Sequence, residues 1–217
     1  MDNVEEKITK RKTKSGKNVS YTIRDNRDRF FYPKEWFKFF DALKDSQKFT
    51  FEFLINTGAR INEARHVKVE DIELEPYPRL MFKVTKIKAR KKEKKPRPRP
   101  MLLSTQFAKE IKKIVKGLKK DDYIPILSTP AANIAMKKTL KEIGIKDYYM
   151  FSIHNIRKTL ATWLLALGAD GFKVAQYLGH DANTLRTSYA TPDVFSFEEK
   201  DSMKLVLGDL VEKMNSK

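Results

Sequence analysis

The chain has 217 residues, enough to bury the core of one domain, and its 45 Lys and Arg against 28 Asp and Glu give a formal net charge of +17. Because it has no Cys, disulfide scaffolds, thiol catalysis and Cys-based zinc sites are excluded, and three scattered His are too few for an all-His metal site. The excess of positive charge predicts a polyanionic partner, of which nucleic acid is the commonest, and we expect chemistry that needs no metal and no cofactor.

The beginning of the chain, residues 1–32, is polar, basic and weakly periodic. It lacks the apolar core of a signal peptide, and no apolar run elsewhere approaches the length of a membrane span. We expect residues 1–32 to be a mobile basic arm and residues 33–217 to form one folded domain. Such a protein is expected to be soluble and cytoplasmic, without a membrane partner.

Two helices are predicted at the start of the folded domain. The stretch YPKEWFKFFDAL has Pro33 where a first helical turn favours proline, and its apolar residues recur at helical spacing. The second helix, QKFTFEFLINTG, ends at Gly58, and INEARHVKV then resumes the helical spacing. The apolar residues expected in the core from these two helices are Trp36, Phe37, Phe40, Leu43, Phe51, Leu54 and Ile55.

A small antiparallel sheet is predicted between residues 71 and 104. The stretches DIELE, PRLMFKVTKI and PRPRPMLLS alternate in polarity and are rich in strand formers. Three prolines restrict the third stretch to an edge of the sheet. The lysine-rich KARKKEKKPRP between the second and third strands predicts a long basic turn, for which a solvated loop without function is the alternative.

The rest of the chain has the periodicity of amphipathic helices, with Ser152 as an expected N-cap and Gly168 as an expected C-cap of the third one. The fold class predicted is therefore α+β, mainly helical with a small antiparallel sheet. The segments expected to be helical are 104–120, 129–144, 152–168, 172–179, a segment beginning near Asn183, and 196–214 as a single last helix.

Three motifs carry residues suited to phosphate chemistry. In TGARINE, helical spacing places Glu63 beside Arg60, where it can orient the guanidinium or form an ordinary surface ion pair. HNIR places His154 and Arg157 in the first turns of a helix, whose N-terminus attracts phosphate. LGHDANTLRTSYATPD contains a His and a Tyr, which alone are more often packing residues than catalytic ones.

The order and spacing of these motifs resemble the catalytic domain of the tyrosine recombinase (phage integrase) family over about residues 33–217. The matching features are TGARINE, a lysine-bearing hairpin, HNIR, LGH and a Tyr that is separated from the His of LGH by eight residues. The resemblance implies the family's fold and a site-specific recombinase or integrase that acts in DNA recombination and integration, including viral genome integration. It also implies double-stranded DNA as a partner and self-association on DNA, as a tetramer in the family.

The resemblance also assigns roles by position. Arg60, His154, Arg157 and His180 match the phosphate-activating cluster, Glu63 its support, and Tyr189 the nucleophile. Lys86 matches the hairpin general acid best, with Lys88 and Lys91 close enough to be alternatives. The residues of the basic turn expected to contact DNA phosphates are Lys88, Arg90, Lys91, Lys92, Lys94 and Lys95.

The chemistry of these residue types agrees with the assignment. Negative charge accumulates on the non-bridging oxygens of a phosphodiester under attack, and guanidinium and imidazole donors stabilise it. A cationic cluster favours the phenolate of a Tyr, and a 3′-phosphotyrosine link conserves the bond energy, so that rejoining needs neither ATP nor metal. The hairpin Lys would protonate the departing 5′-oxygen.

The resemblance leaves alternatives open. Residues 1–32 are too short for the N-terminal DNA-clamping domain usual in the family, so the chain is either a fragment or a minimal recombinase. LATWLLALGADGFKVAQYLGH resembles a helix-turn-helix, which a non-catalytic DNA-binding protein would need. An inactive integrase fragment and a type IB topoisomerase are further alternatives.

Overall fold

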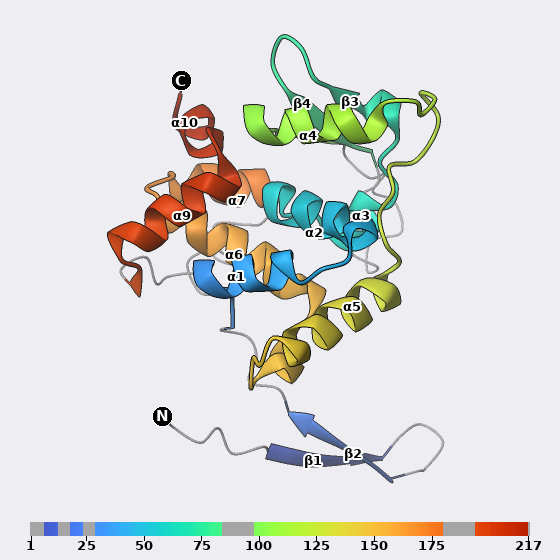
Figure 1. The fold of residues 1–217 in the computed structure, drawn as a ribbon, viewed down its shortest axis with the longest axis vertical. Coiled ribbons are helices and arrows are strands. Elements are labelled where there is room, and N and C mark those ends of the chain that lie inside the picture. The colour runs from blue at the N-terminus through green and yellow to red at the C-terminus, as the bar shows by residue number, and fades with distance from the viewer. Residues whose placement is uncertain (1–6, 13–17, 24–28, 84–97, 180–193, 217) are drawn as a thin grey trace.

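The computed structural model of the protein describes residues 7–12, 18–23, 29–83, 98–179 and 194–216 (Figure 1). Two helices, α2 and α6, pack against each other in the middle of the described residues, and α6 also contacts α5, α7 and α9. The helices, in chain order, are α1 Pro33–Asp41, α2 Asp45–Thr57, α3 Ile61–Ala64, α4 Thr105–Val115, α5 Thr129–Glu142, α6 Ile153–Ala166, α7 Gly171–Leu178, α9 Phe197–Leu207 and α10 Leu210–Asn215.

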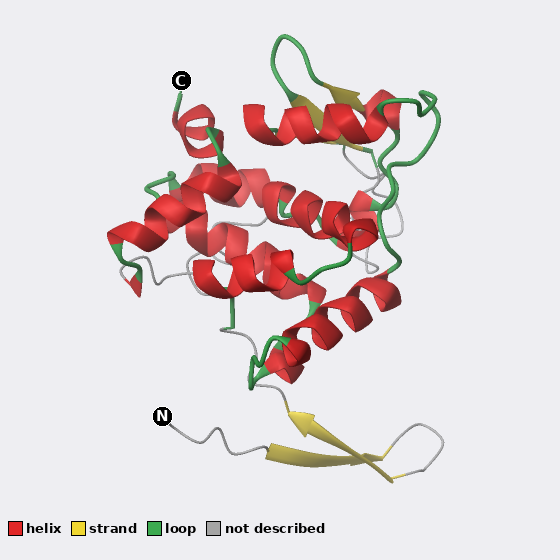
Figure 2. Ribbon diagram, in the orientation of Figure 1, coloured by secondary structure: helices red, strands yellow, loops and turns green. Residues whose placement is uncertain are grey.

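The strands form two separate antiparallel sheets (Figure 2). One has the order β3-β4-β5, so β5 is an edge strand, as the prolines of this segment predicted. The other joins β1 and β2, which lie within the predicted basic arm and were not expected to be strands. The bounds are β1 Lys7–Lys12, β2 Asn18–Ile23, β3 Ile72–Glu73, β4 Arg79–Phe82 and β5 Arg99–Leu102, with short 3-10 helices η2 Val69–Asp71 and η3 Tyr148–Met150.

The fold class is confirmed: most described residues after the arm are helical, and the small sheet is antiparallel. The predicted stripe of α1 is shifted, because Trp36 and Phe39 are buried while Phe37 and Phe40 are only partly so. Ser104, Ser128, Asp170 and Ser196 accept hydrogen bonds from backbone N–H groups at the starts of α4, α5, α7 and α9.

The beginning of the folded domain differs from the prediction. Residues 29–32 were placed in the arm, but Phe31 is fully buried and its backbone N–H donates to Thr159 Oγ1 of α6 at 2.9 Å. Trp163 Nε1 donates to the carbonyl oxygen of Phe31 at 3.0 Å. The side chains of Phe30 and Phe31 are too apolar to stay in solvent, so residues 29–32 pack with the folded domain.

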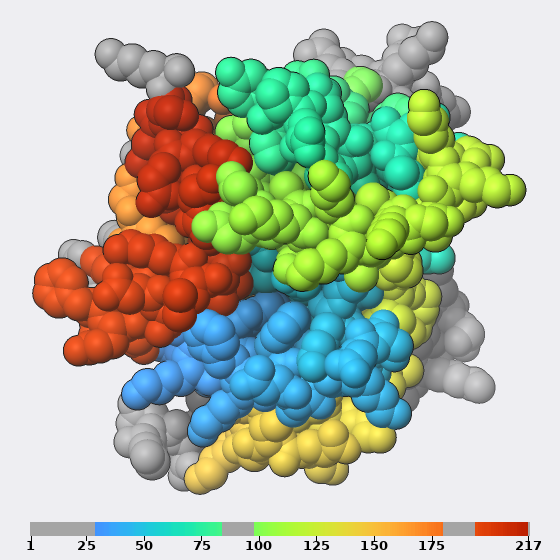
Figure 3. Space-filling view, turned by 45° about the horizontal axis from the view of Figure 1, so that its top comes forward, coloured from blue at the N-terminus to red at the C-terminus, as the bar shows by residue number. Residues whose placement is uncertain are grey.

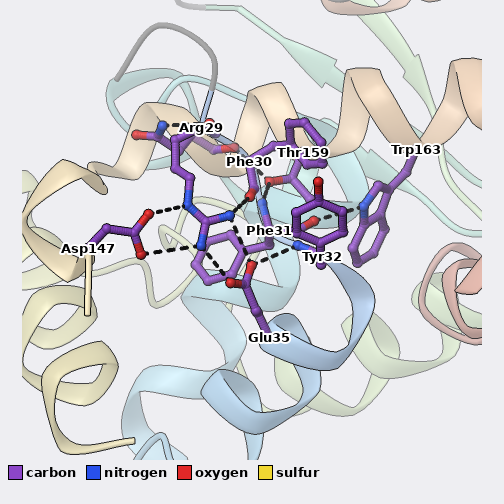
Figure 4. Close-up of polar contacts among 9 residues, drawn as sticks. Arg29, Phe30, Phe31, Tyr32, Glu35, Asp147, Thr159 and Trp163 are labelled. Atoms are coloured by element: carbon purple, nitrogen blue, oxygen red, sulfur yellow. Dashed lines mark hydrogen bonds and ion pairs between the residues drawn. The ribbon is translucent and has the colours of Figure 1, made fainter. Parts of the chain in front are cut away.

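Arg29 holds this entry segment to two elements (Figure 4). Its guanidinium forms ion pairs with Glu35 of α1 at 2.5 Å and with Asp147, the residue before η3, at 2.7 Å. The same group lies 4.5 Å from the ring centroid of Phe151. These hydrogen bonds and ion pairs raise the pKa of Arg29 although burial by itself lowers it.

The end of the chain also differs from the prediction, which placed one helix over residues 196–214. The helix breaks at Gly208, whose φ of 57° is in the region that favours glycine, and α10 begins at Leu210. Figure 3 shows the red α9 and α10 beside α1 and α4 on one face of the molecule. The helix expected to begin near Asn183 lies outside the described residues.

Candidate functional site

Arg60 lies directly after the turn that ends α2 and before α3. Gly58 closes α2 with a φ of 58°, and an added Cβ there would lie 2.5 Å from Leu178 Cδ2 and 2.9 Å from Leu160 Cδ2. The position therefore needs glycine both for its backbone and for the close approach of α6 and α7. This turn places Arg60 at the N-cap of α3, where its side chain is one-third exposed.

Glu63 supports Arg60, as its spacing predicted. Arg60 Nη1 donates to Glu63 Oε1 at 2.8 Å, and the backbone N–H of Arg60 donates to Oε2 at 3.0 Å. The Glu63 carboxylate is only 3% exposed, so the pair lies partly beneath the surface. The predicted contact is confirmed, while the role of Arg60 in phosphate activation stays a prediction.

A second arginine, Arg99 of β5, shares the same carboxylate. Its Nη2 donates to Glu63 Oε2 at 3.1 Å, and its guanidinium lies 4.9 Å from the ring centroid of Phe82, its cross-strand neighbour. Burial alone raises the pKa of Glu63, but hydrogen bonds and charges from Arg60 and Arg99 outweigh burial and hold it below its ordinary value. Glu63 therefore stays ionised at neutral pH.

Arg157 of α6 is buried, with 2% of its surface exposed. Its Nη1 donates to the carbonyl oxygen of Gly58 at 2.5 Å, and its Nη2 donates to the carbonyl oxygen of Leu178. The side chain thus joins the turn before Arg60 to the last residue of α7. In sequence, His180 follows only two residues after Leu178.

His154 lies in the first turn of α6 and its side chain is exposed, whereas Arg157, three residues further on, is buried. The start of α6 is fixed by Asn155, whose Oδ1 accepts the backbone N–H of Ser152 at 2.8 Å. Asn155 Nδ2 also donates to the carbonyl oxygen of Arg29 at 2.8 Å. The helix that carries the HNIR motif is therefore held by the entry segment of the domain.

The described part of the predicted hairpin ends at Lys83. Lys83 Nζ lies 2.5 Å from Asp71 Oδ1 and 3.1 Å from Glu70 Oε1, and these carboxylates, Asp71 first, raise its pKa. The pairs tie the end of β4 to η2 just before the basic turn. The predicted residues that lie outside the described part of the chain are Lys86, Lys88, Arg90, Lys91, Lys92, Lys94, Lys95, His180 and Tyr189.

Sequence reasoning missed Arg99. It was interpreted only as part of a proline-restricted edge strand, and no motif distinguishes it from the neighbouring basic residues. Its position opposite Phe82 in the β4–β5 ladder was a usable signal, since an aromatic ring can cover a guanidinium. What brings it to Glu63 is the packing of β5 beside α3 and α7, which no local pattern encodes.

Within residues 29–83, 98–179 and 194–216, no group of three or more His, Cys, Asp or Glu side chains is placed to hold a metal ion. Among the helices of this part of the chain, none has both the length and the hydropathy needed to cross a bilayer.

The fold corresponds to that of tyrosine recombinases of known structure. The sequence model of the phage integrase family matches residues 29–194, and the chain belongs to this family. The matched range includes residues 29–32, which pack with the folded domain. No curated protein gives a significant match to the chain.

Solved structures share the fold at low sequence identity. XerA recombinase is 17% identical with a TM-score of 0.58, and the match covers 82% of this chain and 64% of that one. The Tn1549 transposon integrase in complex with transposon right end DNA is 15% identical, with a TM-score of 0.60 and coverage of 83% and 66%. XerH recombinase bound to a palindromic difH substrate is 19% identical, with a TM-score of 0.56 and coverage of 73% and 48%. The chain thus spans less than two thirds of each of these proteins.

Proposed function

We propose that this chain is a site-specific DNA recombinase or integrase that breaks and rejoins DNA strands through a 3′-phosphotyrosine intermediate. The observation that carries the proposal is that Arg60, Lys86, His154, Arg157, His180 and Tyr189 all fall, in the expected order, within the residues matched by the phage integrase family. Structures similar to this chain include complexes with DNA, which supports double-stranded DNA as its partner. The net charge of +17 supports the same partner.

In the reaction proposed, the Tyr189 oxygen forms a bond with phosphorus, and the bond from phosphorus to the 5′-oxygen breaks. The phenol proton is released to solvent, and Lys86 gives a proton to the departing 5′-oxygen. Arg60 and Arg157, with His154 and His180, stabilise the charge on the non-bridging oxygens. Attack by a 5′-hydroxyl reverses these steps and needs neither metal nor ATP.

The ion pair of Arg60 supports its part in this scheme. Glu63 holds the guanidinium before DNA arrives, so little reorganisation is needed when a phosphate binds. The side chain of Arg60 is also partly exposed, which allows contact with a ligand. Arg157 is buried beside the same turn, where its positive charge would favour a bound phosphate.

The assembly and place of action are also proposals. We propose that protomers assemble on DNA as a tetramer, with the basic turn of Lys88, Arg90, Lys91, Lys92, Lys94 and Lys95 contacting phosphates. We further propose that the protein acts in the cytoplasm, where the DNA of a host chromosome or a mobile element is accessible. The family membership does not favour a non-catalytic helix-turn-helix protein or a type IB topoisomerase.

The test is covalent attachment to DNA without metal. Labelled duplexes with nicks in a randomised segment are incubated with the protein in EDTA and separated on a denaturing gel. We expect a shifted band with the wild type and none with Tyr189→Phe, while Tyr77→Phe, the same change at a tyrosine that is 78% exposed, keeps the band.

Each outcome of this test is informative. Sequencing the DNA in the shifted band would give the target site. A band that persists in Tyr189→Phe would place the nucleophile elsewhere, and strict dependence on a divalent metal would contradict the mechanism. Exchange of strands between two duplexes, rather than relaxation of a supercoiled plasmid alone, separates recombination from topoisomerase activity.

A further inference from the structure

Arg99 connects two parts of the candidate site that come from distant parts of the sequence. One arm of its guanidinium reaches Glu63 Oε2 at 3.1 Å, and the other donates through Nη1 to the carbonyl oxygen of Tyr177 in α7. We infer that Arg99 is a positioning residue for strand cleavage, which aligns Arg60 through Glu63 and fixes the end of α7 that leads to His180. This inference rests on the proposed function, because it concerns the same reaction.

Arg99 and Arg60 share the carboxylate of Glu63. Glu63 Oε1 accepts from Arg60 Nη1, whereas Oε2 accepts from both the backbone of Arg60 and Arg99 Nη2. Arg99 adds a second, charged donor to Oε2, the oxygen that the backbone of Arg60 already holds, and so further restrains the plane in which Arg60 meets Glu63. Without Arg99, one of the two charged partners of this buried carboxylate is lost and the guanidinium of Arg60 gains freedom.

Arg99 also contacts the C-terminal end of α7. The last carbonyl groups of a helix have no partner within the helix and carry partial negative charge, so a cation there is favourable. Arg99 donates a hydrogen bond to the carbonyl oxygen of Tyr177, and Arg157 donates one to the carbonyl oxygen of Leu178. Gly179 then turns the chain with a φ of 65°, and a Cβ added there would lie 3.2 Å from Arg99 Cδ. Arg99 is thus packed against the residue immediately before His180.

Tyr177 strengthens this connection. Its hydroxyl oxygen lies 3.0 Å from the carbonyl oxygens of Asn56 in α2 and Leu102 in β5, and burial raises its pKa. The tyrosine is therefore a neutral hydrogen-bonding group that ties α7 to the same strand as Arg99. Strand β5 is therefore joined to α7 both through Arg99 and through the backbone of Leu102.

An arginine is needed at this position because three features are used together. The guanidinium fork reaches two acceptors in different elements, and its flat face lies over the Phe82 ring. A lysine keeps the positive charge, but its donors all lie on one nitrogen and it has no planar fork to reach acceptors in two elements. Arg99→Lys therefore removes the connection while it keeps the charge that DNA senses, which makes it the variant that separates positioning from electrostatic attraction.

The experiment compares Arg99→Lys with Arg79→Lys. Arg79 lies on the adjacent strand β4, its side chain is 59% exposed, and it pairs with Glu73. Single-turnover formation of the covalent adduct and the Kd for DNA are measured separately, at a temperature where circular dichroism shows each variant folded. We expect Arg99→Lys to slow adduct formation by roughly tenfold to a hundredfold while Kd stays within about twofold, and Arg79→Lys to change neither.

A double-mutant cycle tests the route through Glu63. If Arg99 acts through this carboxylate, the losses of rate in Glu63→Gln and Arg99→Lys will not add in the double variant. Additive losses would overturn the route, and a wild-type rate in Arg99→Lys would overturn the inference. A parallel fall in affinity and rate would also overturn it, because Arg99 would then contact DNA, and so would failure of Arg99→Lys to fold at any temperature.

Failure of the proposed function is distinguishable from failure of this inference. Absence of a covalent adduct with the wild-type chain would remove the proposed function itself. A wild-type adduct together with an unchanged rate in Arg99→Lys would remove only the role of Arg99.

Discussion

Arg157 in α6 donates a hydrogen bond to the carbonyl oxygen of Gly58, 2.5 Å away, in the turn that precedes Arg60. The two residues are 99 positions apart in the sequence. Since the same guanidinium also takes the carbonyl oxygen of Leu178, one buried side chain joins α6, the turn after α2 and the end of α7. Three elements that carry predicted catalytic residues, or lead to them, therefore meet at one point.

Arg157→Met is expected to destabilise the fold as well as to slow cleavage. Methionine fills a similar volume but leaves the carbonyl oxygens of Gly58 and Leu178 without this donor, at a cost of about 1 to 3 kcal/mol each. Urea unfolding measures the change, and Arg79→Met at the exposed ion pair with Glu73 is the control, with an expected change of about 1 kcal/mol or less. Equal losses in the two variants would contradict a structural role for Arg157.

Gly58→Ala is expected to lower the free energy of unfolding by about 2 to 4 kcal/mol, since the new methyl group overlaps Leu178 and Leu160 and φ is positive. Gly168→Ala is the matched control, because its φ is also positive, at 85°, but nothing lies within 4 Å of an added Cβ. We expect about 1 kcal/mol for this control. Chemical denaturation of both variants separates the steric contribution from the backbone contribution, and similar losses would rule out crowding at Gly58.

Stability should decrease in acid partly because of Glu63. Its folded-state pKa is below the ordinary value of 4.5, so ionised Glu63 contributes stability that is fully present above about pH 4.5. The contribution is lost as the pH falls through the folded-state pKa. Unfolding free energies measured between pH 3 and pH 6 should fall less steeply with acid in Glu63→Gln than in the wild type, and identical slopes would show that Glu63 does not titrate differently on folding.

The beginning of the folded domain is testable by truncation. Deletion of residues 1–28 is expected to change the thermal midpoint of the domain by no more than a few degrees. Deletion of residues 1–32 is expected to lower the midpoint further, because it removes Phe31 and the Arg29 ion pairs. In the full chain, Phe31→Ala should cost about 3 to 5 kcal/mol, because the ring is fully buried. Phe197→Ala, at a ring that is 86% exposed, should change stability by less than about 0.5 kcal/mol. A deletion of residues 1–32 as stable as the shorter deletion would restore the predicted boundary at residue 33.

The sequence predicted features whose cause is local. The end of α2 at Gly58 follows from its positive φ, and the contact of Arg60 with Glu63 follows from a spacing of three residues. Helical periodicity placed most of the helices, and the prolines placed β5 at a sheet edge. The order of the motifs was sufficient to identify the family, whose sequence model matches residues 29–194.

The errors occurred where a local pattern had two solutions. The amphipathic periodicity of residues 196–214 favoured a continuous helix, but Gly208 adopts a conformation that ends it. The basic composition before Tyr32 favoured a mobile arm, but Phe30 and Phe31 have a place in the core that only the finished packing provides. Composition averages over a window and therefore misses two apolar residues at its edge.

The sequence by itself thus determined the family, the fold class and the residues proposed to act on the phosphate. Only the tertiary structure decided that Arg157 is buried, that Arg99 joins Glu63 to α7, and that Phe31 donates its N–H to Thr159. Arg99 and Glu63 are 36 residues apart in the sequence, and Phe31 and Thr159 are 128 residues apart. Helical spacing and capping act over three or four residues, whereas these contacts depend on how whole elements pack, which no local pattern specifies.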